Sequence, residues 1–340
     1  MRAERAGKGI AVYGAYGHTG RFVVAELCRR GYAPILCGRD EGKLSAMAAQ
    51  WPSLQRRVAT VSAPASLDAA LQGADAVINC AGPFLDTAAP VIEAALRAGI
   101  HYLDVAAEQR AAQDVFEQHA QAAAGARVVV MPAMAFYGGL ADLLATAAAG
   151  DWVDVDAIEV AVALDNWHPT LGTRLTGQRN RFPRMVVSQG RPTLLADPAP
   201  VREWCFAPPF GRQSMVALPF TEAITIPRHL KTGSLDSYIN LAALQDIRDP
   251  STPPPVASDD AGRSTQRFTM EVQLRRGGEL RRAEASGQDI YAVSAPLVVE
   301  AVERILGGAV RDAGAIPAGA AFDARDFLAA LASQLTVRIH

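Results

Sequence analysis

Short apolar runs and amphipathic stretches alternate over the first 150 residues of the 340-residue chain. Runs that are apolar throughout are typical of parallel strands covered on both faces, and the stretches between them have a helical period. The alternation predicts an α/β domain over residues 1–150, a doubly wound parallel sheet of the Rossmann type. Strands are expected at residues 9–14, 33–37, 58–61, 76–80, 101–105 and 127–131. Helices are expected after residue 20, at about 41–50, 66–73, 87–97 and 140–149, and in the alanine-rich stretch up to 124.

The pattern changes after Gly150. Residues 155–164 alternate with period two, as a half-buried strand does, and the runs on either side of Gly277-Gly278 predict a β-hairpin. Residues 151–319 are therefore predicted to form an α+β domain with a mixed or mostly antiparallel sheet, which binds the substrate or forms a homodimer. The C-terminal helix within 320–340 is expected to pack back on the first domain. Helices are expected at 170–179, 295–306 and 322–335, and a surface loop at 249–255.

Composition and charge exclude several classes of partner. The formal net charge of −2 gives no basis for binding nucleic acid or an anionic membrane. The N-terminus lacks the apolar stretch of a signal peptide, and polar and helix-breaking residues interrupt the most apolar segment, 127–150, so no membrane span is expected. The four cysteines have no metal-ligand spacing. We expect a cytoplasmic protein with reduced thiols and no metal, which acts on a small molecule.

The stretch that carries chemistry is Gly14-Ala-Tyr-Gly-His-Thr-Gly20, directly after the first predicted strand. Gly14 lets the chain leave the strand in a tight turn, Gly17 lets a pyrophosphate approach the backbone, and Gly20 lets the helix pack against the strand. The N–H groups at the helix start and the positive end of its dipole then face the phosphates. The motif predicts a dinucleotide site at Gly14, Tyr16, Gly17, His18, Thr19 and Gly20.

The end of the second strand gives opposite indications about the cofactor. Asp40 lies about twenty residues after the last glycine, where an acid of NAD enzymes binds the ribose hydroxyls. Arg39 precedes it and Lys43 follows within one turn, and a guanidinium here can bind a 2′-phosphate through two parallel hydrogen bonds. We favour NADP(H), with Arg39 as the phosphate ligand. NAD, and a solvated Arg39, are the alternatives.

Residues after the later strands are candidates for the nicotinamide end of the site, because ligands bind beyond the carboxyl ends of parallel strands. Asp104 and Tyr137 are the candidate proton donors, since hydride transfer needs a proton source. The alternatives are a helix cap for Asp104 and packing for Tyr137. A wall for the nicotinamide ribose, or else a plain turn, is expected at Cys80, Ala81, Gly82 and Pro83.

Two groups of side chains in the second half bear on the substrate. Five arginines occur between Asp165 and Asp197 with no acid among them, and they form either an anion-binding wall or a solvated face. Aromatic residues between Trp152 and Phe220 either line an apolar pocket or form the core of the second domain. The five arginines are Arg174, Arg179, Arg181, Arg184 and Arg191.

Four motifs in the first 110 residues together resemble the saccharopine dehydrogenase (saccharopine reductase) superfamily, which includes trans-acting enoyl reductases. The resemblance implies NAD(P)-dependent hydride transfer and a second domain built on a mixed sheet. The chain has Ala106-Ala107-Glu108 where the family often has Thr-Gly-Glu, and it lacks the proline of the Gly-x-x-Pro-Gly turn of opine-forming members at 136–139. The second departure argues against an amino-acid substrate. The motifs are Gly14-Ala-Tyr-Gly-His-Thr-Gly20, Cys37-Gly-Arg-Asp40, Val77-Ile-Asn-Cys-Ala-Gly-Pro-Phe84 and Gly99-Ile-His-Tyr-Leu-Asp-Val-Ala-Ala-Glu108.

The leading hypothesis is an NADPH-dependent oxidoreductase that transfers a hydride to a C=N or C=C bond of a small organic substrate. One alternative is a non-catalytic NADP(H)-binding sensor or scaffold, which binds the cofactor and turns nothing over. The other is an opine-type amino-acid dehydrogenase, which an arginine pair aimed at the substrate would favour.

Overall fold

The computed structural model describes residues 7–310 and 312–340, and these form two compact units. The first unit comprises, as far as they are described, Met1–Ala135, Leu175–Asn180 and Ser294–Ile316. The second comprises Phe136–Arg174, Arg181–Val293 and Pro317–His340. No helix in the described part of the chain is both long and apolar enough to cross a bilayer.

The first unit is built on a sheet of seven described strands, and every pair of neighbours is parallel. Their order is β15-β6-β5-β4-β1-β2-β3, so the chain changes direction across the sheet between β1 and β4. Dinucleotide-binding folds have this order, and their ligands bind beyond the carboxyl ends of the strands at the switch point. The strands are β1 (Ile10–Tyr13), β2 (Ile35–Gly38), β3 (Arg56–Val58), β4 (Ala76–Asn79), β5 (His101–Asp104), β6 (Val129–Met131) and β15 (Gly314–Ala315).

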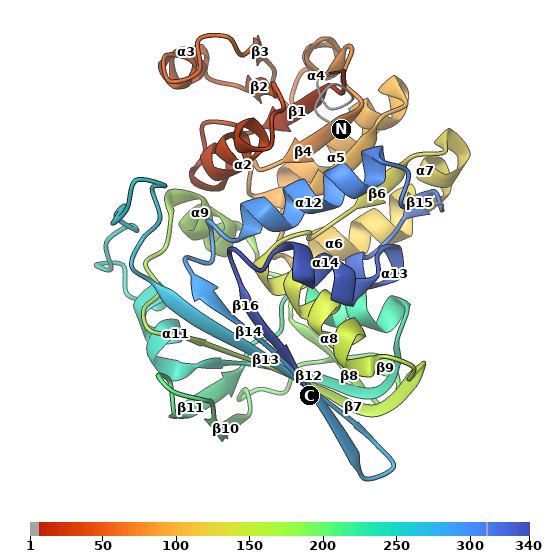
Figure 1. Ribbon diagram of the computed structural model, residues 1–340, viewed down its shortest axis with the longest axis vertical. Coiled ribbons are helices and arrows are strands. Elements are labelled where there is room, and N and C mark those ends of the chain that lie inside the picture. The colour runs from red at the N-terminus through yellow and green to blue at the C-terminus, as the bar shows by residue number, and fades with distance from the viewer. Residues whose placement is uncertain (1–6, 311) are drawn as a thin grey trace. The chain divides into compact units, whose positions relative to one another are not determined.

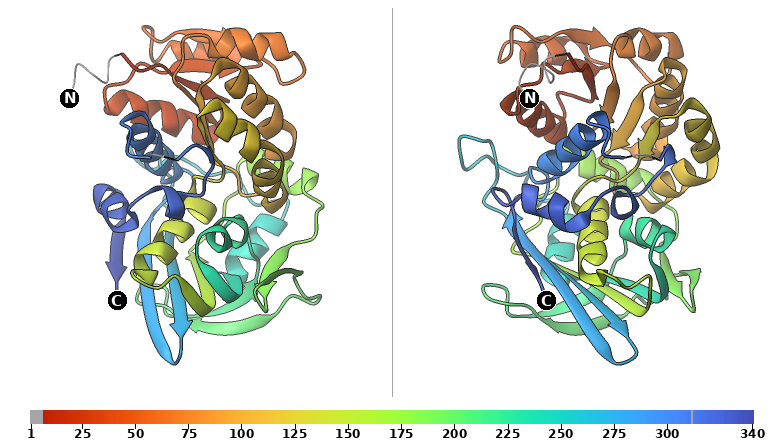
Figure 2. Two further views of the ribbon diagram at one scale, coloured as in Figure 1. Left: turned by 90° about the vertical axis from the view of Figure 1, so that its right-hand side faces the viewer. Right: turned by 45° about the vertical axis from the view of Figure 1, so that its right-hand side comes forward.

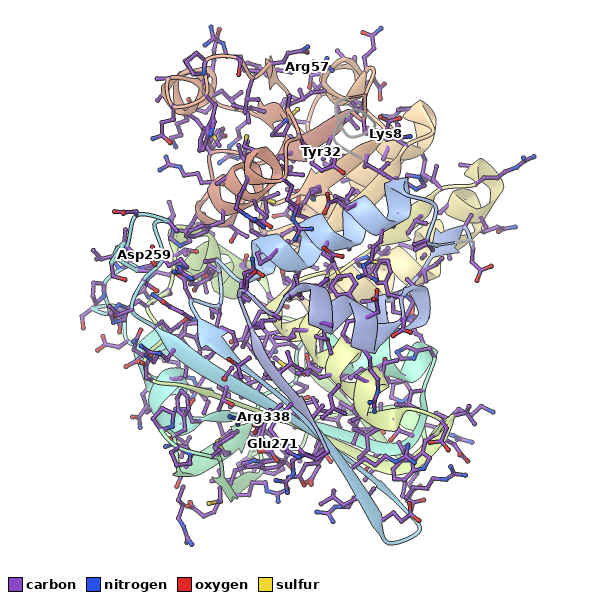
Figure 3. All side chains as sticks on the ribbon, in the orientation of Figure 1. Lys8, Tyr32, Arg57, Asp259, Glu271 and Arg338 are labelled. Atoms are coloured by element: carbon purple, nitrogen blue, oxygen red, sulfur yellow. The ribbon has the colours of Figure 1, made fainter. Side chains whose placement is uncertain are left out.

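Burial on both faces explains the apolar strands of this sheet, since every residue of β1, β2 and β4 is buried beneath helices. Local signals set the helix ends. One helix begins after Pro83 and ends where Gly99 takes a left-handed conformation, with φ +67°. Arg57 caps the C-terminal end of the helix Pro64–Leu71, because its guanidinium donates to the carbonyl oxygens of Ala70 (2.9 Å) and Gln72 (2.6 Å) (Figure 3). The helices are α2 (His18–Arg29), α3 (Glu41–Ala48), α4 (Pro64–Leu71), α5 (Phe84–Ala98), α6 (Gln109–Asp114) with the π-turn η1 (Val115–His119), α7 (Ala120–Ala126) and α12 (Ser294–Leu306).

The helix α12 reaches the first unit from far along the sequence and lies beside α2 (Figure 1). Arg30, directly after α2, joins the two helices. Its guanidinium donates to Glu26 at 2.7 Å, to Glu300 at 2.5 Å and to Glu303. Removing this largely buried arginine would leave three carboxylates without their shared partner, so the cluster fixes the position of α12 against α2.

The second unit is built on a mixed sheet of nine described strands. Its main path is β10-β11-β12-β7-β13-β14-β16, and the short β8 and β9 branch from β12. Only β12 and β7 are parallel among the pairs of the described strands; the others are antiparallel. The strands are β7 (Asp154–Leu164), β8 (Met185–Ser188), β9 (Arg191–Leu194), β10 (Val201–Cys205), β11 (Arg212–Ala217), β12 (Lys231–Asn240), β13 (Arg267–Arg276), β14 (Glu279–Gln288) and β16 (Thr336–Ile339).

The long hairpin of β13 and β14 shows the two faces of this sheet (Figure 2). Along β13, the fully buried Met270 and Val272 alternate with Glu271, which pairs with Arg282 at 3.3 Å. Arg338 of β16 pairs with Glu284 of β14 at 2.6 Å in the same way (Figure 3). The helices of this unit are α8 (Ala141–Ala149) after the π-turn η2 (Phe136–Leu140), α10 (Glu222–Thr225) with η3 (Ile226–Arg228), α11 (Leu241–Arg248), α13 (Ala318–Ala321) and α14 (Ala324–Ala330), and the unit boundary crosses α9 (Leu171–Arg179).

The predicted fold class, a Rossmann-type parallel sheet and a second mixed sheet, is confirmed. The structure divides the chain differently from the predicted boundaries at 150 and 319. The helix α8 belongs to the second unit and α12 to the first, and residues 317–340 belong to the second unit rather than returning to the first. An amphipathic helix records that one face is covered but not which sheet covers it, so the sequence pattern did not reveal these exchanges.

Candidate functional site

The turn between β1 and α2 has no room for side chains at its first and last glycines. Gly14 has φ +80°, and a Cβ there would lie 2.9 Å from both Cβ and N of Ala81. A Cβ on Gly20 would lie 2.2 Å from the carbonyl oxygen of Gly14. Real Cβ contacts are not this short, so the turn can adopt this shape only with glycine at both positions.

The start of α2 offers its backbone donors to a ligand. Gly17 is the N-cap residue and provides no side-chain cap, and no acid lies in the first turn. His18, Thr19 and Gly20 begin the helix, so their N–H groups belong to the first turn, which has no partners within the helix. Together with the positive end of the helix dipole, this arrangement fits a pyrophosphate.

The end of β2 is organised by Tyr16. A Cβ on Gly38 would lie 2.5 Å from Cε1 of Tyr16, so the tyrosine ring occupies the space that a side chain would need. The Tyr16 hydroxyl accepts a hydrogen bond from the backbone N of Asp40 at 3.3 Å, and the Lys43 ammonium lies 5.8 Å from the ring centre. Arg39 is exposed and makes no hydrogen bond or ion pair within the described residues.

Asp40 is already engaged by its own helix. It is the N-cap of α3, and its Oδ1 accepts a hydrogen bond from the backbone N of Lys43 at 2.9 Å. Its Oδ2 lies 3.7 Å from the Lys43 ammonium. A carboxylate held in this way is poorly placed to accept two ribose hydroxyls, whereas the exposed Arg39 and Lys43 suit a phosphate.

Cys80, Ala81, Gly82 and Pro83 form the turn after β4, next to the glycine turn. Asn79 and Thr87 hold the peptide groups of Ala81 from both sides: Asn79 Oδ1 accepts from its N at 3.0 Å, and the Thr87 hydroxyl donates to its O at 2.6 Å. Burial raises the pKa of the Cys80 thiol, so it is a neutral side chain rather than a thiolate. This rigid turn lies where a wall was predicted.

Asp104 joins the ends of three strands. It is 1% exposed, and its Oδ1 accepts from the backbone N of Ala106 (3.0 Å) and Ala133 (2.7 Å). Its Oδ2 accepts from the hydroxyl of Tyr102 (2.9 Å), which in turn accepts from Asn79 (3.2 Å). Burial raises the pKa of Asp104, and the two backbone donors oppose this rise. Both oxygens are therefore engaged, and this geometry favours a positioning role; direct proton donation by Asp104 remains a prediction.

Glu108 makes a second link of the same kind. It is buried, and its Oε1 accepts from the backbone N of Phe84 at 2.8 Å, which ties the start of α5 to the segment after β5. In the sequence, Glu108 stands out only as part of a motif, and nothing there predicts the roles of Asn79 and Tyr102. A polar residue at the last position of an apolar strand, as in the run that ends at Asn79, is the signal that could have indicated them.

Tyr137 lies in the second unit, buried among aromatic rings. It stacks on Phe220 with 3.9 Å between ring centres, and Trp167 lies at 5.9 Å. Its hydroxyl has no hydrogen-bond partner in the part of the chain that the structure describes. Burial raises the pKa of Tyr137 well above the ordinary value for tyrosine.

The five arginines do not form one wall. Arg179 pairs with Asp86 at 2.8 Å, and Arg174 donates to the carbonyl oxygens of Asp249 and Thr252. Arg181 and Arg191 are exposed. Arg184 is half-buried, with its guanidinium 4.8 Å from the ring centre of Phe220. The aromatic residues divide in a similar way, since Trp204 and Phe206 form a separate core cluster.

Comparison with known proteins identifies the first unit. Residues 10–130 match the family model described as the saccharopine dehydrogenase NADP binding domain. Among curated proteins, the bovine saccharopine dehydrogenase-like oxidoreductase is 30% identical over 152 residues, which are 39% of this chain and 35% of the relative. A trans-acting enoyl reductase of Mycobacterium bovis is 30% identical over 132 residues, 36% of this chain and 31% of the relative. The matches thus span about a third of the relatives' length.

The fold of the whole chain also has a solved counterpart. Saccharopine dehydrogenase (L-Glu forming) from Saccharomyces cerevisiae aligns over 98% of this chain and 100% of its own, with a TM-score of 0.69 and 11% identity. At this identity the likeness concerns the fold alone. The predicted preference for NADP(H) agrees with the family match and with the engaged Asp40. Residues 10–130 therefore match the saccharopine dehydrogenase NADP binding domain, and the whole chain has a fold similar to that of saccharopine dehydrogenase.

Proposed function

We propose that this protein is an NADPH-dependent oxidoreductase that reduces a C=N or C=C bond of a small organic substrate. The observation that carries the proposal is the end of β2, where Asp40 caps α3 and leaves Arg39 and Lys43 for a 2′-phosphate. Tyr16 completes this cradle, because its hydroxyl accepts from Asp40 and keeps its own proton available for donation. When bound, NADPH would supply the hydride.

The residues around the nicotinamide end would act by positioning. Asp104 fixes the backbone after β5 and β6, and Glu108 fixes the turn that begins α5. Asn79 and Thr87 hold the peptide groups of Ala81 in the wall between them, and such preorganisation is what a hydride acceptor needs in order to stay aligned. Tyr137 remains the candidate for donating the proton.

A titration with NADPH and NADH tests the cofactor assignment. Arg39→Ala is expected to weaken NADPH binding and to leave NADH binding unchanged, because only NADPH carries the phosphate. Arg56→Ala, at another exposed arginine of the first unit, is the control and should change neither affinity. An unchanged NADPH/NADH preference in Arg39→Ala would contradict the assignment.

A non-catalytic NADP(H) sensor is the second candidate function. It is favoured by the surroundings of the two predicted proton donors. Both carboxylate oxygens of Asp104 already accept hydrogen bonds, and the hydroxyl of Tyr137 is buried, so neither group faces solvent. NADPH oxidation should be followed with imine-forming pairs of amines and 2-oxo acids and with enoyl thioesters. Tight NADPH binding without oxidation by any acceptor would favour the sensor over the reductase.

A further inference from the structure

A small cavity lies in the second unit, against the strands β7, β12 and β13. Its volume is about 10 Å³. Apolar side chains such as Val160, Val162 and Met270 form most of its lining. Besides Tyr238, three side chains with polar groups line it, Tyr137, Glu222 and Ser237, and these come from three different elements: η2, α10 and β12.

The polar atoms at this cavity are buried and unsatisfied. The hydroxyl of Tyr137, Oε2 of Glu222 and Oγ of Ser237 have no hydrogen-bond partner within the described residues. The other oxygen of Glu222, Oε1, accepts from the backbone N of Phe220 at 2.8 Å. Unpaired polar groups in a protein interior cost free energy, and nearly all of them are satisfied in folded proteins. One molecule in the cavity can be the partner that all three atoms share.

The size of the cavity limits what that partner can be. A space of about 10 Å³ is close to the smallest that holds one water molecule. A buried water needs two to four polar neighbours, and this lining supplies three. The two hydroxyls can each donate or accept, and the carboxyl oxygen accepts, or donates when it is protonated, so all three can bind the same water.

We propose that this cavity is a binding site for one water molecule, which joins the Tyr137 hydroxyl to the Glu222 carboxyl and the Ser237 hydroxyl. The charged and titratable groups around Glu222 are Tyr137 and Arg184. Burial raises the pKa of Glu222, and the backbone N of Phe220, the nearby Ser237 hydroxyl and the Arg184 guanidinium oppose this rise. Under the proposed function, on which this step rests, a proton that Tyr137 gives up would be replaced through the water. Glu222 would lose its proton to the water as the water passes one to Tyr137.

The effect of single substitutions on stability distinguishes a filled cavity from an empty one. Ser237→Ala removes one partner of the water and is expected to lower the apparent melting temperature by about 2–4 °C. Thr225→Val is the matched control. Its hydroxyl is also buried and unpaired among the described residues but does not line the cavity, so its removal should leave the melting temperature unchanged or raise it. An empty cavity predicts that Ser237→Ala behaves like Thr225→Val.

Two further measurements test the link between Tyr137 and Glu222. A crystal structure should show a water within hydrogen-bonding distance of all three polar side chains, and an empty cavity would overturn the proposal. The infrared band of the protonated Glu222 carboxyl, identified by its loss in Glu222→Gln, reports the pH at which Glu222 ionises. Tyr137→Phe should move that midpoint to higher pH and Thr225→Val should not, whereas equal midpoints would refute the link. None of these readouts needs NADPH, so they are independent of the proposed function.

Discussion

Tyr16→Phe tests the cradle at the end of β2 with the smallest possible change. The substitution removes one oxygen and keeps the ring that fills the space above Gly38. Its hydroxyl accepts from Asp40 N at 3.3 Å, which brings it to the turn that carries the exposed Arg39 and Lys43. The ring should keep its place in the variant, which loses the long hydrogen bond from Asp40 N and the donor to the 2′-phosphate.

The expected magnitude follows from the kind of hydrogen bond removed. A hydrogen bond to a charged group contributes about 1.5–3 kcal/mol, and the exposure of this turn places it at the lower end. A loss of about 1.4 kcal/mol corresponds to a tenfold change in affinity. The dissociation constant of NADPH should thus rise about tenfold, while that of NADH should stay the same because NADH has no 2′-phosphate.

Fluorescence titrations of both dinucleotides at one fixed salt concentration measure this difference directly. Salt must be held constant because the exposed cradle is screened by ions. A parallel loss of NADPH and NADH binding would mean that Tyr16 supports the whole turn rather than the phosphate. Unchanged binding of both would mean that the hydroxyl makes no contact with the cofactor, and either result would refute this reasoning.

Three other substitutions test separate parts of the structure. Gly20→Ala places a Cβ 2.2 Å from the Gly14 oxygen. It should lower the free energy of unfolding, measured in urea, by about 1–3 kcal/mol and should weaken NADPH binding. Gly125→Ala is the control, because its Cβ meets no other atom, and it should stabilise α7 slightly. Asp104→Asn replaces the carboxylate that accepts from Tyr102 and two backbone N–H groups with a weaker acceptor. It should lower the free energy of unfolding in urea by about 2 kcal/mol. An unchanged free energy of unfolding would contradict the positioning role of Asp104. His229 lies 2.6 Å from the buried Asp142, which raises the pKa of His229 although burial opposes it. The stabilisation by protonated His229 is complete below the unfolded pKa of 6.5 and is lost as the pH rises through the folded pKa. His229→Gln should therefore lower the melting temperature most at pH 5–6 and least at pH 9. A difference in melting temperature that does not depend on pH would refute this reasoning.

The first sheet could be predicted closely because its signals are local. Each buried strand is a short apolar run, and each is followed by a turn or a helix start that the sequence marks, as at Gly14 and Gly99. The strand β15 and the helix α12 were not assigned to this unit, because they follow more than 290 residues into the chain. A strand of two residues has no periodicity, and its pairing with β6 depends on contacts that no local pattern records.

In the candidate site, too, the local features were predicted from the sequence and the contacts between strands were not. Its glycines were predicted from their spacing, and the structure gives Gly14 and Gly20 a steric reason. The chain of hydrogen bonds from Asn79 through Tyr102 to Asp104 was not predicted, because it joins side chains from neighbouring strands. In the sequence such residues look like ordinary polar positions, and only the register of β4 and β5, which pairs Asn79 with Asp104, brings them together.

Asp40 shows why the choice of cofactor cannot be inferred from the presence of an acid alone. An acid after the second strand indicates NAD when its oxygens are free to accept the ribose hydroxyls. Here the same residue starts α3, and helix N-caps and ribose ligands compete for the same carboxylate oxygens. Lys43 lies at the position whose backbone N the cap binds, and its ammonium approaches the second oxygen. Asp40, with Arg39 before it and Lys43 three residues after it, is therefore better explained as a helix cap within a phosphate-binding turn. The same reasoning applies wherever a helix begins directly at the end of the second strand.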